Sequence, residues 1–424
     1  MIAELTTKRN LNLAYEQVYR NKGVGGVDEM GVAQLKSHLQ TNGAKYIEQI
    51  RVGDYQPSPI LGIAIPKSNG KTRLLGIPTV TDRVFQQAMH QVLQPVFELD
   101  FQQYSYGFRP NRNAQQAVAQ SLTNINSGYQ HIVDIDLKSF FDEVEHYVLL
   151  DLIYKKVKCK ATLKLLRKFL RVPIQINGKL HRRRKGVPQG SPLSPLLSNI
   201  LLNELDKELE KRGHKYVRYA DDFSIYVRSA KSAKRVGNSI YTFLRDKLHL
   251  PINREKSGLR KPVNFNLLGF GFVPTYKKGE KGKYQLVVKL SKWEELKAKL
   301  KAITRKTIPA SFDERIRRIN LLIRGWINYF KKASIHQKLK KLDEWLRNRL
   351  RYCIWHDWKK PERKRKNLIR LGINQGQAYA WSRTRMGGWA TAQSPILITT
   401  ITKDRLKKRG YISMLDHYLQ VKQD

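Results

Sequence analysis

Three aspartates stand out in this chain because each follows or interrupts an apolar segment. Asp136 comes directly after the run HIVDI, in which alternate residues are apolar as in a strand. Asp221 and Asp222 lie at the bend of VRYADDFSIYV, whose alternating large residues predict strand–turn–strand. An Asp pair at a bend is typical of an ordinary polar turn, and paired carboxylates also suit Mg²⁺. The local pattern leaves both interpretations open.

The charge of the whole chain favours the metal site. There are 80 Lys and Arg residues against 35 Asp and Glu, which gives a net charge of +45. A small domain stays soluble with roughly 2–8 units of charge, so this excess indicates a polyanionic partner. Three converging acids repel one another unless cations neutralise them. Two Mg²⁺ ions would do so, and they would also activate a 3′-hydroxyl and stabilise a leaving pyrophosphate.

The composition excludes several other classes of protein. A length of 424 residues predicts two to four domains, and 41% hydrophobic residues are enough for real cores. The two cysteines, Cys159 and Cys353, form no CxxC pattern, which excludes a disulfide framework and zinc fingers of that type and fits a reducing compartment. No signal peptide and no 18-residue apolar run is present, so we expect a cytoplasmic protein without a membrane span.

Strands and helices follow one another irregularly along the first two thirds of the chain. Short apolar runs flank Asn69-Gly70 and again Asn177-Gly178, and both dipeptides are signals for hairpin turns. Apolar residues at helical spacing predict helices over 82–101 and 191–211. Long gaps between the strands favour an α+β fold over regular βαβ units.

From about Ser291 the pattern becomes all-helical and strongly basic. Residues 291–370 contain 25 Lys and Arg against 8 Asp and Glu. Ser291 and Ser311 each stand three residues before a glutamate, which is a capping-box signature and predicts two helix starts. Pro361 is expected to close this helical part, and the last 60 or so residues are expected to form a small separate module.

Several longer motifs occur in an order that is typical of one family. IVDIDLKSFFDEVEH, GVPQGSPLSPLLSNILLNELD, VRYADDFSIYV and LLGFGF resemble the palm motifs of reverse transcriptases. RNKGVGGVDEM, GIPTVTDRVFQQA, SYGFRPNRNAQQAV, GWINYF and RLRYCIWHDWKK are similar to motifs of the proteins encoded by bacterial group II introns. The resemblance runs from about residue 11 to residue 420.

The resemblance implies roles for individual residues. Asp136, Asp221 and Asp222 match the acids that bind two Mg²⁺ ions, with Leu137 beside them as a further metal contact. The residues that match the dNTP-binding positions are Lys67, Arg73, Phe141, Gln189 and Lys256. The residues that match positions near template and primer are Arg109, Arg112, Gly269 and Phe270.

Each of these roles has a simpler alternative. Phe141 matches the ring that stacks under the incoming sugar, yet a core position would also explain it. Lys67 and Arg73 match residues that grip the triphosphate, and the alternative for both is a solvated hairpin. Gln189 matches a residue that lines the nucleotide pocket, and the alternative is a plain turn. Lys256 matches a lysine proposed to protonate pyrophosphate, and the alternative is a surface lysine. Arg109 and Arg112 are equally compatible with a structural role. Asp134 and Asp142 are interpreted as an edge-strand acid and a helix cap.

The fold that the resemblance implies is a right-hand polymerase. It would comprise an N-terminal extension over 1–58, fingers and palm over 59–284, an all-helical thumb over 285–360 and a DNA-binding module over 361–424. Many relatives carry a C-terminal nuclease with paired cysteines and histidines. This chain shows no such cluster, so we do not expect it to cleave DNA.

The expected activity is RNA-directed DNA synthesis from dNTPs with two Mg²⁺ ions, on a template RNA and a primer or target DNA. The expected partner is a group II intron RNA, whose splicing and mobility the protein would support as a maturase. The oligomeric state, monomer or homodimer, stays open. Two rivals are a splicing factor with a vestigial polymerase and a free-standing reverse transcriptase with another role, and the intact acids and PQG motif argue against the first.

Overall fold

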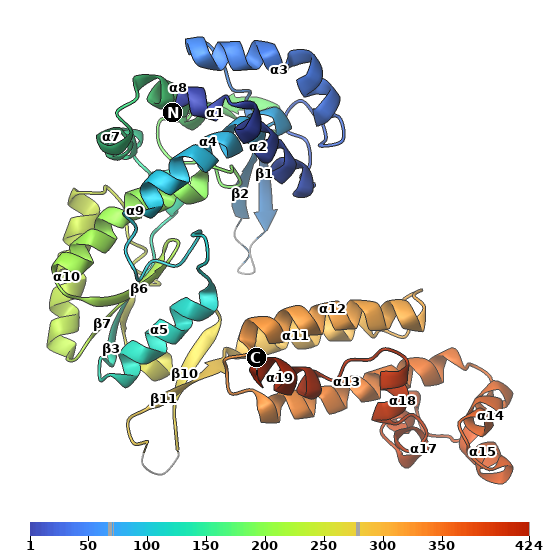
Figure 1. Cartoon of the computed structure of the whole chain (residues 1–424). Helices are drawn as coiled ribbons and strands as arrows, with labels where there is room; N and C mark the ends of the chain where they lie inside the picture. Colours follow the sequence, from blue (N-terminus) through green and yellow to red (C-terminus); the bar gives the residue numbers. More distant parts are fainter. Residues whose placement is uncertain (67–69, 71, 277–279, 424) are drawn as a thin grey trace. The chain divides into compact units, whose positions relative to one another are not determined.

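The computed structural model describes residues 1–66, 70, 72–276 and 280–423. It contains helices and mostly antiparallel sheets, as the predicted α+β class requires. The chain divides into two compact units, Met1–Lys261 and Pro262–Asp424. Figure 1 shows the elements of both units, coloured along the sequence. Lys67 and the Asn69 half of the first predicted hairpin turn lie outside the described residues.

Unit 1 contains ten of the helices in the described part of the chain. They are α1 (Ile2–Leu5), α2 (Lys8–Arg20), α3 (Leu35–Val52), α4 (Val80–Glu98), α5 (Ala114–Asn126), α6 (Phe140–Glu143), α7 (His146–Val157), α8 (Lys160–Arg171), α9 (Ser194–Lys211) and α10 (Ala230–Asp246). The predicted helices over 82–101 and 191–211 correspond to α4 and α9. Both are largely buried, so tertiary packing as well as helical spacing holds them.

The first sheet of unit 1 joins the two predicted hairpins. Its strands are β1 (Ile60–Pro66), β2 (Thr72–Ile77), β4 (Ile174–Ile176) and β5 (Lys179–His181), in the order β2-β1-β4-β5. The turn between β4 and β5 is Asn177-Gly178, and both residues have positive φ angles, 49° and 79°. Positive φ at both central residues is the requirement of a type I′ turn, so this predicted hairpin is confirmed.

The second sheet of unit 1 carries the three aspartates. Its strands are β3 (His131–Ile135), β6 (Lys215–Tyr219), β7 (Asp222–Val227) and β8 (Gly258–Arg260), in the order β6-β7-β3-β8. One face, with Val133, Ile135 and Ile225, belongs to the hydrophobic core of the unit together with residues of α9 and α10. On the other face the Tyr226 hydroxyl donates to the Ser121 hydroxyl of α5 at 2.7 Å. The two faces of the sheet therefore carry alternate residues of β3 and β7, as the sequence predicted.

Unit 2 begins with a small sheet and continues as helices. The sheet has the order β11-β10-β9, from β9 (Asn266–Leu267), β10 (Phe270–Pro274) and β11 (Tyr284–Val288). A single 3₁₀ turn, Pro262–Asn264, precedes it. The helices are α11 (Leu290–Ile303), α12 (Phe312–Phe330), α13 (His336–Asp357), α14 (Pro361–Arg370), α15 (Gln375–Ser382), α16 (Gly388–Ala392), α17 (Pro395–Ile398), α18 (Lys403–Lys408) and α19 (Met414–Gln423). In Figure 1, α11, α12 and α13 lie beside one another.

The helix boundaries of unit 2 confirm one predicted cap and correct another. Ser311 caps α12, since its side chain accepts a hydrogen bond from the Glu314 N–H at 3.1 Å. The cap predicted at Ser291 is wrong, because α11 already begins at Leu290 and its N-cap residue is Lys289. Pro361 is the first residue of α14, where a missing N–H costs nothing.

The end of the chain packs onto the helices before it. The buried Asp343 of α13 accepts hydrogen bonds from the Ser413 hydroxyl at 2.9 Å and from the Met414 N–H at 2.9 Å. The Tyr411 hydroxyl also donates to this carboxylate. In the described part of the chain, no helix is long and apolar enough to cross a membrane.

Candidate metal and nucleotide site

The three aspartates come from neighbouring strands of one sheet. Asp136 follows β3 directly, and Asp222 begins β7, whose next residue Phe223 pairs with Ile135. Asp221 lies in the two-residue turn that joins β6 to β7, which the pair Tyr219 and Asp222 closes. Antiparallel pairing therefore brings acids 85 residues apart in the sequence to the same end of the sheet.

The backbone on either side of Asp136 is fixed by a second segment. The Asp136 N–H donates to the Ser257 hydroxyl at 3.0 Å, and the Asp136 carbonyl accepts from the Asn253 N–H at 2.8 Å. Leu137 forms an isolated bridge with Ile252 and is buried. The hydrogen bonds of this bridge are made by the Asp136 carbonyl and the Lys138 N–H, and not by Leu137 itself. Because a leucine side chain has no metal-binding atom, Leu137 could contribute to a metal site only through its backbone carbonyl.

The electrostatics of the three carboxylates are coupled. Burial raises the pKa of the Asp221 carboxyl, and the charge of Asp136 raises it further. Burial and the charges of Asp221 and Asp136 raise the pKa of the Asp222 carboxyl from 3.8 to about 6. Each shift shows that a negative charge here is costly without a compensating cation.

Two cationic side chains lie at this group of acids. Lys256 Nζ is 3.1 Å from Asp136 Oδ2. The positive charge of Arg73 opposes the rise in the pKa of the Asp221 carboxyl that burial causes. The guanidinium of Arg73 also donates to the side-chain oxygen of Gln189. The structure therefore brings together three of the predicted dNTP-binding residues, Arg73, Gln189 and Lys256, around the aspartates.

Phe141 is buried in the core of unit 1, and its side chain is 9% exposed. The residue before the PQG motif bonds to its backbone, since the Val187 N–H donates to the Phe141 carbonyl at 2.7 Å. The core interpretation that the sequence left open thus describes this ring in the structure. Asp134 forms an ion pair with Arg260 at 2.7 Å. Its interpretation as an edge-strand acid is wrong, because β3 pairs with β7 on one side and β8 on the other.

The two arginines of SYGFRPNR differ in their surroundings. The Arg109 side chain is 5% exposed and forms an ion pair with Glu98 at 2.7 Å. Its guanidinium also donates to the carbonyls of Gln102 and Ser105, at 2.6 and 3.0 Å. Arg112 lies over the Tyr106 ring, 5.4 Å from its centroid, and stays partly exposed. A structural role therefore describes Arg109, and only Arg112 presents charge to solvent.

Gly269 and Phe270 belong to unit 2. Gly269 has φ +84° and follows Leu268, which has φ 52°, so the two residues form a tight turn before β10. The Phe270 ring is fully buried and packs on Phe330, with 4.9 Å between ring centroids. Of the two predicted residues, Phe270 is therefore buried, and only Gly269 in the turn could contact a nucleic acid.

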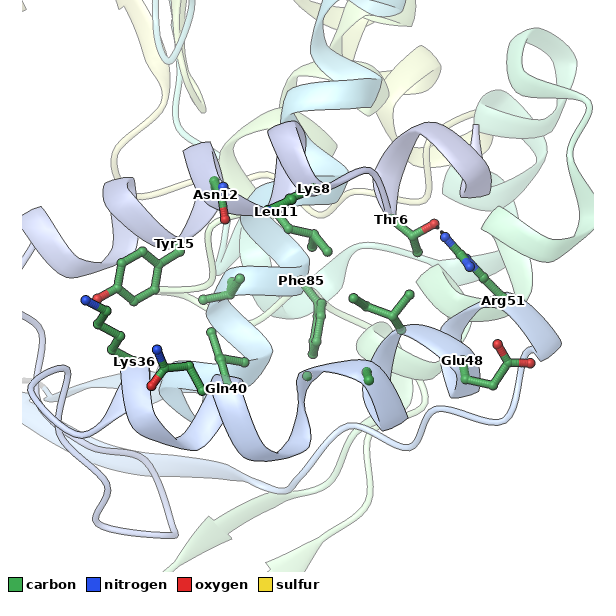
Figure 2. Close-up of a pocket in the computed structure, with 15 residues that line it drawn as sticks. Thr6, Lys8, Leu11, Asn12, Tyr15, Lys36, Gln40, Glu48, Arg51 and Phe85 are labelled. Carbon is green, nitrogen blue, oxygen red and sulfur yellow. Dashed lines mark hydrogen bonds between the residues drawn. The ribbon is translucent and has the colours of Figure 1, made fainter.

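A separate groove lies in the N-terminal part of unit 1. It has a volume of about 920 Å³ and is lined by Thr6 and by residues of α2, α3 and α4. Figure 2 shows Lys8, Lys36 and Arg51 around it and Phe85 at its floor. Arg51 donates to the Thr6 hydroxyl at 3.2 Å across one end. None of the predicted site residues lines this groove.

Four further residues contact the turn that carries Asp221, directly or through one another, and were not predicted from the sequence. They are Gly107, Asn199, Asp206 and Arg218. A signal for two of them was present, because Asn199 and Asp206 are polar residues at helical spacing among the leucines of the predicted helix. Arg218 gave none, since one arginine among so many basic residues does not indicate burial.

Comparison with known proteins identifies the family. Residues 65–272 match the family described as reverse transcriptase (RNA-dependent DNA polymerase). Residues 293–372 match the group II intron maturase-specific domain. The chain belongs to the group II intron reverse transcriptase and maturase family. The predicted family is thereby confirmed.

Individual relatives of this family align over part of their length. The group II intron-encoded protein LtrA of Lactococcus lactis subsp. cremoris is 33% identical over 182 residues, which cover 42% of this chain and 30% of LtrA. Protein YkfC of Escherichia coli K12 is 34% identical over 169 residues, 39% of this chain and 44% of YkfC. The chain thus spans less than half the length of either of these two relatives.

One solved structure with a similar part is a Cas6-RT-Cas1–Cas2 complex. It is 23% identical to this chain, with a TM-score of 0.36, and the match covers 57% of this chain and 26% of that one.

Proposed function

We propose that this protein is an RNA-directed DNA polymerase that adds dNTPs to a DNA 3′ end. The observation that carries the proposal is the placement of Asp136, Asp221 and Asp222 at one end of the sheet, with raised carboxyl pKa values for the last two. In the terms of the family, residues 59–284 would form fingers and palm. The helices α11–α13 of unit 2 would form the thumb, and residues 361–424 a DNA-binding module.

The donor set fits divalent magnesium. Carboxylate oxygens are the ligands that Mg²⁺ prefers, and Mg²⁺ usually keeps several waters and takes substrate phosphates as further ligands. Among the described residues, no group of three or more His, Cys, Asp or Glu side chains could hold a metal ion as placed. A Mg²⁺ ion that is bound by one or two carboxylates, with water and a triphosphate as its other ligands, does not need three such side chains around it. Asp136, Asp221 and Asp222 would hold two ions, with the Leu137 carbonyl beside them.

When bound, the two ions supply charge neutralisation and activation of the attacking hydroxyl. The side chains of this protein do the positioning. Arg73 presents a guanidinium suited to charge-assisted hydrogen bonds with phosphate, and it is held by Gln189 of the PQG motif. Lys256 lies within 3.1 Å of Asp136, where its ammonium group could deliver a proton to leaving pyrophosphate. Phe141 matches the family's position under the incoming sugar, and its ring would act there from within the core.

We also propose that the protein binds a group II intron RNA and supports its splicing and mobility. The match to the maturase-specific domain over 293–372 supports this role. The net charge of +45 provides the attraction to a polyanion. The basic rim of the groove in Figure 2, with Lys8, Lys36 and Arg51, offers one surface for it in unit 1.

The rival function is a splicing factor without polymerase activity, and one variant separates the two. Asp221→Ala removes a metal ligand but leaves the basic surfaces unchanged. We expect it to abolish DNA synthesis while binding of the intron RNA stays near native, measured by filter binding at moderate salt. A parallel loss of both would contradict the separate placement of the two functions.

A further inference from the structure

A buried ion pair lies directly under the turn that carries Asp221. Arg218 of β6 and Asp206 of α9 have side chains that are both 0% exposed. Arg218 Nε donates to both carboxylate oxygens of Asp206, at 2.9 and 3.0 Å. A buried charge is costly unless it is paired and fully hydrogen-bonded. The other nitrogens of the Arg218 guanidinium therefore also need hydrogen-bond partners.

The Nη1 group of Arg218 is directed at the turn. It donates to the carbonyl oxygen of Ala220 at 2.9 Å, which is the carbonyl that immediately precedes Asp221. The same Nη1 donates to the side-chain oxygen of Asn199 at 2.9 Å. Arg218 thus connects α9 to the peptide that enters Asp221.

Asn199 continues the connection to the other side of the turn. Its Nδ2 donates to the carbonyl of Gly107 at 2.9 Å. Gly107 lies directly against the turn that carries Asp221, since a Cβ at position 107 would be 2.2 Å from the Ala220 nitrogen. Ala220, Arg218, Asn199 and Gly107 therefore form a closed ring of contacts that holds Ala220 from both its nitrogen and its carbonyl.

The conformation that this ring holds is not one that alanine adopts easily. Ala220 has φ 58°, in the left-handed region that most residues other than glycine avoid. A conformation of this kind persists where the surrounding contacts determine it. The direction in which the Asp221 carboxylate points follows from it.

The same stripe of α9 contains a natural comparison. Asn203, one turn after Asn199, is also buried, and it accepts from the Gln102 N–H at 3.3 Å and donates to the Asp100 carbonyl at 3.2 Å. It fixes the 100–107 segment to α9, as Asn199 does, but none of these bonds involves the turn. Loss of Asn203 therefore reports on stability alone.

We propose that Arg218 and Asn199 are positioning residues that set the metal affinity of the Asp221 site through the Ala220 peptide. This inference rests on the proposed function, in which Asp221 holds a metal ion. Residues that orient metal ligands without touching the metal commonly affect affinity or activity by about 10- to 100-fold. The ring of contacts assigns that role to Arg218 and Asn199.

The test measures binding of Mn²⁺, as a spectroscopic substitute for Mg²⁺, by electron paramagnetic resonance of the full chain. Binding by Asp221→Ala is subtracted as the contribution of other sites. We expect Asn199→Ala to bind Mn²⁺ about 10-fold more weakly than the native chain. We expect Asn203→Ala to bind as the native chain does, although both variants lower the urea midpoint of unfolding.

Arg218→Lys is the second variant and keeps the positive charge opposite Asp206. One ammonium group cannot make all the directed bonds of the guanidinium, so weaker Mn²⁺ binding is expected here too. Native-like Mn²⁺ affinity in both Asn199→Ala and Arg218→Lys would overturn the positioning role alone. Identical Mn²⁺ binding by the native chain and Asp221→Ala would overturn the proposed metal site and this inference with it.

Discussion

At the scale of single residues, the acids of the sheet are held in a state that disfavours their charge. The pKa of the Asp222 carboxyl is raised from 3.8 to about 6 by burial and by Asp221 and Asp136. A carboxyl whose pKa is higher in the folded chain than in the unfolded chain lowers the free energy of unfolding as the pH rises between the two pKa values. Its charge therefore opposes folding at neutral pH when no cation is bound.

Asp222→Asn tests this expectation in the presence of a chelator. The variant should melt at a higher temperature than the native chain at about pH 7.5, and the difference should shrink as the pH falls toward about 4, the pKa of an unperturbed Asp. Differential scanning fluorimetry across this range provides the measurement. A variant that melts lower than the native chain at neutral pH would show that the Asp222 charge is already compensated by the protein.

At the scale of elements, the segment between α4 and α5 is held by a buried arginine. Arg109 bonds to Glu98 and to two backbone carbonyls with a side chain that is 5% exposed. Breaking a buried pair of this kind costs about 3–5 kcal/mol. Arg109→Ala should therefore lower the free energy of unfolding by this order, read from the urea midpoint.

Arg112→Ala is the matched variant three residues along the chain. Its guanidinium lies on Tyr106 and is partly exposed, so we expect a small effect on stability and a measurable loss of affinity for template RNA. Equal destabilisation by the two variants would contradict the different roles that the structure gives them.

The sequence predicted the elements that are defined by local signals. Asn177-Gly178 predicted a hairpin because its two residues must adopt positive φ, and helical spacing predicted α4 and α9. The cap at Ser291 failed because a serine three residues before a glutamate also occurs inside a helix. Gly107 could not be predicted, since its role depends on a contact with Ala220 about 110 residues away, and Arg218 could not, since one arginine among so many basic residues does not indicate burial.

At the scale of the whole molecule, charge dominates the expected behaviour toward nucleic acids. Each phosphate contact by Lys or Arg contributes about −0.7 to −0.9 to the slope of log affinity against log salt. With a net charge of +45, we expect a steep slope for intron RNA that is the same for the native chain and Asp221→Ala. A shallow slope, measured by filter binding at several salt concentrations, would mean that the basic surfaces contribute little.

The most direct test of the account is primer extension on an RNA template with Mg²⁺ and dNTPs. The native chain is compared with Asp221→Ala and with Asp151→Ala, which removes an exposed acid paired with Lys155 on α7. We predict extension by the native chain and by Asp151→Ala and none by Asp221→Ala. Extension by Asp221→Ala at the native rate, or none by the native chain despite tight RNA binding, would contradict a polymerase centre at Asp136, Asp221 and Asp222.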